Sequence, residues 1–258
     1  MLRFLLKKSF FDIWDNFIPL FISNIATAAV ILGLYILLQV TGEVSIGVLA
    51  VILAIFLAIL TVMLFALNGM AHQWSDWKSD CMHGLCLSIK NNPGHMLFFY
   101  VITCTIGFCV LFMFPFYMQS NSYMGILMAV VLFWIFLVVV PAMIYYIPLA
   151  LYMPDDGAFL TFKKCLALVL NNKAVTLFVF LRTVLDVIIT LGTCLLVPGI
   201  TGICVIHQDT VRLLLMKHDY MRKHLCKGED VDWRAVLEKE EATLGPRSIR
   251  TIIFPWKD

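Results

Sequence analysis

Six long apolar runs, separated by short loops, constrain this chain more than any other feature of its sequence. A helix needs about 20 mostly apolar residues to cross the hydrocarbon core of a bilayer, and each run is close to that length. Backbone polar groups in that core must be satisfied within the chain, so such runs are helices. The sequence therefore predicts an all-α, polytopic integral membrane protein with six transmembrane helices. The predicted spans are Phe17–Val40, Ser45–Met70, Leu97–Met118, Met124–Leu151, Val175–Val197 and Gly199–Met216.

The composition and the placement of basic residues agree with this class and predict an orientation. Hydrophobic residues make up 61% of the chain, charged residues only 14%, and the mean hydropathy is +0.91. Lys and Arg are absent from the loops Thr41–Glu43 and Gln119–Tyr123 and from the turn at Pro198, whereas the intervening loops and both ends carry them. Because basic loops stay on the cytoplasmic side, we expect both termini in the cytoplasm. The predicted location is the cell (inner) membrane, crossed an even number of times.

A unit made of an amphipathic segment, an Asn-rich turn and a helical hairpin occurs three times in the sequence. The segments Asp76–Asn92 and Asp156–Asn172 both have apolar residues at helical spacing, and both end in Asn-Asn before a predicted span. Such amphipathic helices are typical of the membrane interface. The N-terminal segment has a similar stripe, formed by Leu6, Phe10, Ile13 and Phe17, with Lys8, Asp12 and Asp15 opposite. We predict one transmembrane domain, residues 1–225, with units at about 1–70, 75–151 and 156–217.

The remaining residues, 226–258, read as a cytoplasmic tail. Asp232–Leu244 is predicted to form a short helix, capped by Asp232 and closed by Gly245-Pro246. The final stretch, RSIRTIIFPWKD, mixes basic, aliphatic and aromatic residues. It could dock on the protein itself, lie on anionic lipid or bind a partner.

Ionisable residues within predicted spans are the candidate functional residues, because holding them at membrane depth is costly unless they are paired or wet. They gather in the last hairpin, as Arg182, Asp186, His207, Asp209 and Arg212. With about 1.5 Å of rise per residue, folding the hairpin at Pro198 brings these side chains to similar depths. One interpretation is a polar pocket or an ion path. The other is a closed charge network, with an ion pair Arg182–Asp209 or Asp186–Arg212 joining the two helices.

The sequence contains none of the common catalytic or nucleotide-binding motifs, such as GxxxxGK[ST], GxGxxG, HExxH or GxSxG. No second His or carboxylate stands at helical spacing from His207 to build a metal site. We therefore expect no catalytic residues, no metal and no cofactor, and we expect the protein not to be an enzyme.

The layout of hairpins and amphipathic helices resembles the YesL-like family of small bacterial polytopic membrane proteins. The stretches that carry the resemblance are WSDWKSDCMHGLCLSIKNNPGHMLFF, its later counterpart FLTFKKCLALVLNNKAVTLFVF, and the final VPGITGICVIHQDTVRLLLMKH. Members of that family often accompany carbohydrate uptake systems and have no established activity. The resemblance therefore implies a bacterial membrane protein and an association with such a system, without implying a mechanism.

The leading functional hypothesis from the sequence is a non-enzymatic accessory or scaffolding subunit of a membrane complex, linked to solute (carbohydrate) transport. The alternative is a small-molecule transporter or channel that uses the polar cluster of the last hairpin. The expected partners are the lipid bilayer and a membrane protein or transporter complex, and no nucleic acid is expected.

Overall fold

The computed structural model describes the chain except for residues 42–44, 79, 121, 225–230, 246 and 248–258. All regular secondary structure in the described residues is helical, as the sequence predicts. The end of the tail, including the FPWKD stretch, lies outside the described residues. In chain order the elements are α1 (Leu2–Asp15), α2 (Phe17–Thr41), α3 (Ile46–Ser75), α4 (Cys81–Asn91), α5 (Pro93–Phe108), the π-helical η1 (Cys109–Met113), α6 (Phe114–Gln119), α7 (Tyr123–Tyr152), α8 (Ala158–Asn171), α9 (Lys173–Gly192), α10 (Gly199–His224) and α11 (Trp233–Leu244).

Several of these helices are suited to a membrane. Within the described part of the chain, five segments are long and apolar enough to cross a bilayer, which is consistent with a multi-pass membrane protein. The predicted sixth span, which corresponds to α10, is not among the five, because polar and charged residues such as Gln208, Asp209 and Arg212 interrupt it. The count of six spans therefore stays a prediction. The five segments are Phe17–Gln39, Gly47–Ser75, Pro93–Gln119, Tyr123–Tyr152 and Lys173–Gly192.

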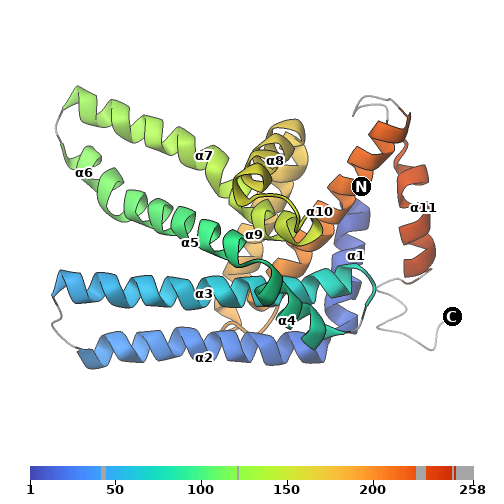
Figure 1. Ribbon diagram of the computed structural model, residues 1–258, viewed down its shortest axis with the longest axis horizontal. Coiled ribbons are helices and arrows are strands. Elements are labelled where there is room, and N and C mark those ends of the chain that lie inside the picture. The colour runs from blue at the N-terminus through green and yellow to red at the C-terminus, as the bar shows by residue number, and fades with distance from the viewer. Residues whose placement is uncertain (42–44, 79, 121, 225–230, 246, 248–258) are drawn as a thin grey trace.

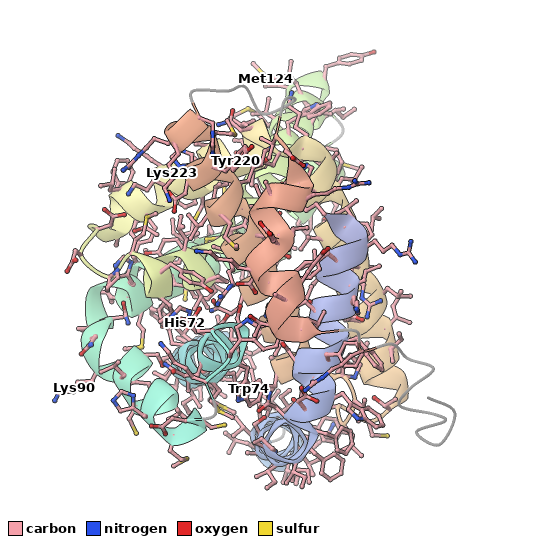
Figure 2. The ribbon with its side chains drawn as sticks, turned by 90° about the vertical axis from the view of Figure 1, so that its right-hand side faces the viewer. His72, Trp74, Lys90, Met124, Tyr220 and Lys223 are labelled. Atoms are coloured by element: carbon pink, nitrogen blue, oxygen red, sulfur yellow. The ribbon has the colours of Figure 1, made fainter. Side chains whose placement is uncertain are left out.

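The helices run in two main directions. In Figure 1, α2, α3, α5 and α7 extend toward the same side of the molecule, α1 and α10 run across them nearer the opposite side, and α9 passes behind the middle. Figure 2 agrees, since α2 and α3 are seen end-on there while α1 is seen from its side. The hairpin of α9 and α10 therefore runs across the hairpin of α2 and α3.

The junctions between amphipathic and spanning helices form where the sequence predicts them. α4 ends at Asn91 and α5 follows, and α8 ends at Asn171 before α9. At both junctions the second asparagine donates its side-chain amide to the carbonyl four residues earlier, at 2.9 Å for Asn92 and 3.2 Å for Asn172. Both have negative φ, −121° and −129°, so the left-handed cap that asparagine often adopts is not used. The asparagines instead satisfy a carbonyl at the end of the preceding helix.

The amphipathic helices α4 and α8 lie against the ends of the spanning helices. Leu85 on α4 and Leu166 on α8 are partly buried against the hydrophobic core, and so is Trp77 just before α4. Phe159 on α8 is instead 61% exposed. The apolar faces predicted for these segments are therefore present, with part of each directed at the protein.

α3 and α4 approach each other at a pair of glycines. A Cβ atom built on Gly69 would lie 2.4 Å from the carbonyl oxygen of Gly84, and one built on Gly84 would lie 2.6 Å from the carbonyl oxygen of Gly69. Small residues allow this close backbone contact between helices. The contact fixes α4 beneath the end of α3, next to the polar network described below.

Candidate functional site

The first amphipathic helix, α1, buries its charged face. Lys8 and Asp12 are 0% and 3% exposed, whereas Leu6 and Phe10 on the other side are 42% and 36% exposed. Residues four apart share one face of a helix, and Lys8 and Asp12 lie on one face as the sequence predicts. This face contacts the protein together with Phe4, Leu5 and Phe11. The prediction is wrong for Asp15, which is 45% exposed, and for Ile13, which packs against the hydrophobic core.

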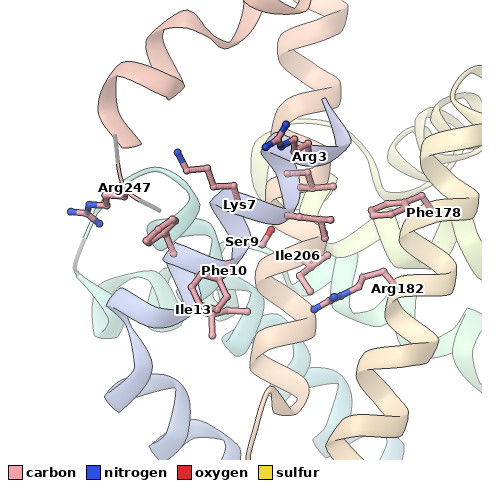
Figure 3. A pocket seen from close by; sticks show the side chains of 12 residues that line it. Arg3, Lys7, Ser9, Phe10, Ile13, Phe178, Arg182, Ile206 and Arg247 are labelled. Carbon is pink, nitrogen blue, oxygen red and sulfur yellow. The ribbon is translucent and has the colours of Figure 1, made fainter. Parts of the chain in front are cut away.

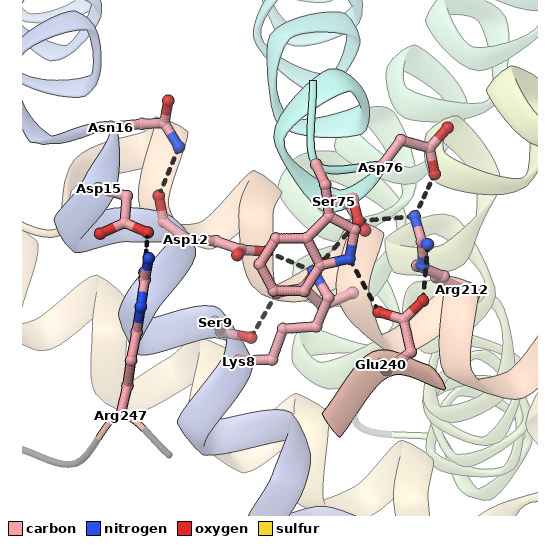
Figure 4. Close-up of polar contacts among 12 residues, drawn as sticks. Lys8, Ser9, Asp12, Asp15, Asn16, Ser75, Asp76, Arg212, Glu240 and Arg247 are labelled. Carbon is pink, nitrogen blue, oxygen red and sulfur yellow. Dashed lines mark hydrogen bonds and ion pairs between the residues drawn. The ribbon is translucent and has the colours of Figure 1, made fainter. Parts of the chain in front are cut away.

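Lys8 lies at the centre of a buried polar network (Figure 4). Its ammonium donates to Asp12 Oδ2 at 2.5 Å, to Asp209 Oδ1 at 2.8 Å and to the Ser75 carbonyl at 3.2 Å. The ring of Trp77 is 4.7 Å from Nζ. An ammonium has three N–H donors, and each has an acceptor here. Three helices, α1, α3 and α10, are joined through one side chain.

Asp209 is paired with α1. It is fully buried, and it accepts a hydrogen bond from Ser9 Oγ at 2.7 Å in addition to that from Lys8. Every carboxylate that is taken out of water needs such donors, because desolvation otherwise makes the ionised form very costly. The two bonds to consecutive residues of α1 hold that helix across α10.

Arg212 continues the network toward the C-terminal helix. It donates to the Ser75 carbonyl at 2.6 Å, pairs with Asp76 and contacts Glu240 Oε1 at 2.7 Å. Glu240, on α11, also accepts a hydrogen bond from Trp77 Nε1 at 3.1 Å. α11 has the N-cap predicted from the sequence, since the Asp232 side chain accepts from the Arg234 amide. The tail helix is therefore attached through Glu240 to Arg212 of α10 and to Trp77, which follows α3.

The electrostatics of the Lys8 cluster follow from one ammonium facing two carboxylates. Burial raises the pKa of Asp12 to about 8, and the nearby Asp209 carboxylate acts in the same direction, while Lys8 opposes both. Burial disfavours the charged form of Lys8, but its two carboxylate partners outweigh this and raise its pKa above 10.5. Lys8 is thus an ammonium at neutral pH and does not act as a nucleophile. The group able to gain or lose a proton near neutral pH is Asp12.

The cluster predicted from the last hairpin is divided between two sites. Arg182 Nε donates to Asp186 Oδ2 at 2.9 Å, within α9 itself. His207 Nε2 is 2.9 Å from Thr183 Oγ1, also on α9. Asp209 and Arg212 face away from this pair, toward α1, α3 and α11. The structure therefore brings Arg182 and Asp186 together, with His207 nearby on the same helix-helix contact.

The two ion pairs proposed from the sequence are wrong. Neither Arg182–Asp209 nor Asp186–Arg212 is among the ion pairs of the described residues. The charged residues of the two helices lie at similar depths, as predicted, but they do not point toward one another. His207 is the residue of α10 that contacts α9, and Asp209 is about 200° away from it around the helix, so Asp209 points away from α9. Asp209 and Arg212, three residues apart, share the other face.

Lys8, Ser9, Asp12, Asp76 and Glu240 belong to the network but were not candidates from the sequence. The spacing of Lys8 and Asp12 was a usable signal, because oppositely charged residues four apart on a helix pair readily. No local pattern shows that this pair is buried. Asp76 and Glu240 lie 164 residues apart, and both pair with Arg212.

Asparagines of α2 and α3 contact α10 and the turn that precedes it. Asn24 on α2 donates to the carbonyls of Leu196 and Pro198, both at 2.9 Å, and accepts from the Thr201 amide at 3.1 Å. Asn68 on α3 accepts from Gln208 Nε2 at 3.2 Å. These polar residues within the spans therefore serve contacts between helices.

Side chains that could ligate a metal are scattered through the described part of the chain. No three His, Cys, Asp or Glu side chains among these residues are grouped so that they could hold a metal ion. Comparison with protein-family models, with curated proteins and with solved structures finds no match to this chain. The role of the polar network is therefore inferred from its own geometry.

Proposed function

We propose that this protein is a non-enzymatic accessory or scaffolding subunit of a membrane complex. The observation that carries the proposal is the closure of the buried polar network. Lys8, Asp209 and Arg212 have their donors and acceptors directed at one another, at Ser9 and Ser75, and at α11. A transport path needs polar groups that are free to meet a solute, whereas these groups fasten helices to one another.

The rest of the molecule supports the same proposal. α2, α5 and α7 carry no Asp, Glu, Lys or Arg, and they expose large apolar side chains along their length. Such faces suit lipid or another membrane helix. We further propose that both termini are cytoplasmic, that the membrane is the bacterial inner membrane, and that the partner is a solute uptake system of the kind that accompanies YesL-like proteins.

The proposal is tested by isolating the tagged full-length chain in a mild detergent after cross-linking in intact cells. We expect a membrane protein to be retained at a fixed ratio through two successive purification steps. Its absence in both steps, with the protein itself well folded, would contradict the scaffold proposal.

A matched pair of variants tests whether a partner lies on a defined face. Phe108 and Phe112 are both 56% exposed and stack at 5.4 Å between ring centroids; Phe108 precedes the π-helical segment η1 and Phe112 lies within it. Segments of this kind are frequent at functional sites. We expect Phe108→Leu/Phe112→Leu to reduce partner recovery, and Ile22→Leu/Ile25→Leu, on exposed positions of α2, to leave it unchanged. Equal recovery from both variants would exclude this face.

One observation favours the alternative function, a small-molecule transporter. Asp186 Oδ1 and Thr190 Oγ1, one turn apart on α9, are buried and have no hydrogen-bond partner within the described part of the chain. Unpaired polar atoms are costly and could meet a solute. The transporter alternative predicts solute uptake into proteoliposomes that is abolished by Asp186→Asn, and the scaffold proposal predicts no uptake by either protein.

A further inference from the structure

A cavity of about 690 Å³ lies between α1 and α9, with α10 as its floor (Figure 3). Its volume is within the range of about 300–1,000 Å³ that small-molecule sites occupy. Four basic side chains line it: Arg3 and Lys7 on α1, Arg182 on α9, and Arg247, which pairs with Asp15. Apolar side chains form the rest of its wall, among them Phe10, Phe178 and Ile206.

The charge of this cavity has one sign. None of its lining residues is acidic. Arg3 and Lys7 have no ion pair or hydrogen bond with any described residue. Arg182 uses only Nε for Asp186, so its terminal amino groups are left without a partner among the described residues. The cavity therefore offers unpaired donors of positive charge to an anion.

The surroundings of the cavity are those of a membrane-facing site. The outer face of α9 exposes Leu177, Leu181 and Leu185, with exposed fractions of 60%, 59% and 48%. The outer face of α1 exposes Leu6 and Phe10, and Phe10 stacks on Trp14 at 6.2 Å. Apolar walls of this kind do not stabilise a small soluble anion. They do stabilise an acyl chain, because its contact with apolar side chains replaces contact with water.

We propose that this cavity binds an anionic phospholipid of the surrounding membrane. The phosphate lies between Arg3, Lys7 and Arg182, and the first part of an acyl chain lies against Phe10 and Phe178. Basic pockets between membrane helices are known to hold anionic headgroups in this way. The lipid connects α1 to α9, both of which pack against α10, and so completes the packing of the crosswise helices.

The experiment uses the purified full-length protein in detergent, with added phosphatidylglycerol, phosphatidylcholine or inorganic phosphate. Native mass spectrometry counts retained lipids, and the midpoint of thermal unfolding reports their effect. We expect one phosphatidylglycerol to be retained per chain and to raise the midpoint, with no such effect of phosphatidylcholine. Equal retention of both lipids would overturn the proposal, and equal protection by inorganic phosphate would show a site for a soluble anion instead.

Two double variants that each remove two positive charges distinguish a specific lipid site from general electrostatic attraction between the protein and anionic lipid. Arg3→Gln/Lys7→Gln removes two basic groups that have no structural partner among the described residues, and Lys90→Gln/Lys173→Gln removes two that lie outside the cavity. Each basic group near an anionic lipid contributes about fivefold, so we expect retention about 30-fold weaker in the first variant. The second should bind as the wild type does. An equal loss in both would overturn the site, and the wild-type lipid comparison stands even if the first variant fails to fold.

Discussion

The buried charges of this protein are arranged around shared acceptors. The Ser75 carbonyl accepts from both Lys8 and Arg212, at 3.2 Å and 2.6 Å. A backbone carbonyl has two lone pairs and can accept both. Two cationic side chains from helices far apart in the sequence are thereby fixed at the end of α3. Substituting one residue of the polar network at a time measures how much each contributes to the free energy of unfolding.

The pairing of Asp209 is tested by two double-mutant cycles. We expect Lys8→Met and Asp209→Asn to be coupled, because each single change leaves a buried charge without its partner, at a cost of about 3–5 kcal/mol. The double variant should be more stable than the sum of the two effects predicts. We expect Arg182→Met and Asp209→Asn to be additive to within about 0.5 kcal/mol. The measurement is unfolding in detergent, and coupling of the second pair with none in the first would refute the observed arrangement.

Asp12 predicts a pH dependence of stability. Its pKa is raised from 3.8 to about 8 in the folded protein, so folding favours the protonated form. The stabilisation is fully present below about pH 4 and is lost as the pH rises to about 8. Asp12→Asn is neutral at every pH. The unfolding midpoint of this variant should therefore change less between pH 5 and pH 8, the range in which the raised pKa of Asp12 acts, than that of the wild type.

The matched control for this measurement is Asp15→Asn on the same helix. Asp15 is 45% exposed and pairs at the surface with Arg247, at 2.6 Å. Its replacement should leave the pH dependence unchanged. A wild-type profile as flat as that of Asp12→Asn would show that Asp12 does not titrate in this range.

At the scale of elements, the contact of α3 with α4 depends on the absence of side chains. Gly69→Ala places a methyl group against the backbone of Gly84, which cannot move aside without displacing α4. Overpacking of this kind costs about 1–3 kcal/mol. Gly33→Ala on α2 is the control, because a Cβ there meets nothing within 4 Å. The control should keep the wild-type unfolding midpoint or exceed it slightly, and a loss of stability equal to that of Gly69→Ala would count against the close contact.

At the scale of the whole molecule, the two ends of α7 should lie on opposite sides of the membrane. Ser122 precedes α7 and is exposed, and Lys163 on α8, beyond its other end, is exposed as well. In a background without native cysteines, Ser122→Cys should react with an impermeant thiol reagent added to intact cells, and Lys163→Cys should react only after lysis. The reverse pattern would invert the orientation predicted from the basic residues. Restoring Cys194 alone tests the turn after α9, which six spans place outside.

The sequence by itself determined the local features of this protein. Hydropathy identified the long helices, helical spacing placed Lys8 and Asp12 on one face of α1, and the Asn-Asn pairs located both helix junctions. Capping residues also gave the bounds of α11. These features depend on residues within a few turns of one another, so their signals survive in a single sequence.

Only the tertiary structure decided which charges meet and how the last hairpin lies. Lys8 and Asp209 are 201 residues apart, and the local pattern of neither indicates the other. Hydropathy gives the length of α9 and α10 but not the angle at which they cross α2 and α3. That angle and those ion pairs depend on one another, because Asp209 reaches α1 only where α10 crosses it. Burying the charged side chains of α1 is favourable because Asp209 and the Ser75 carbonyl lie opposite Lys8 and accept its hydrogen bonds.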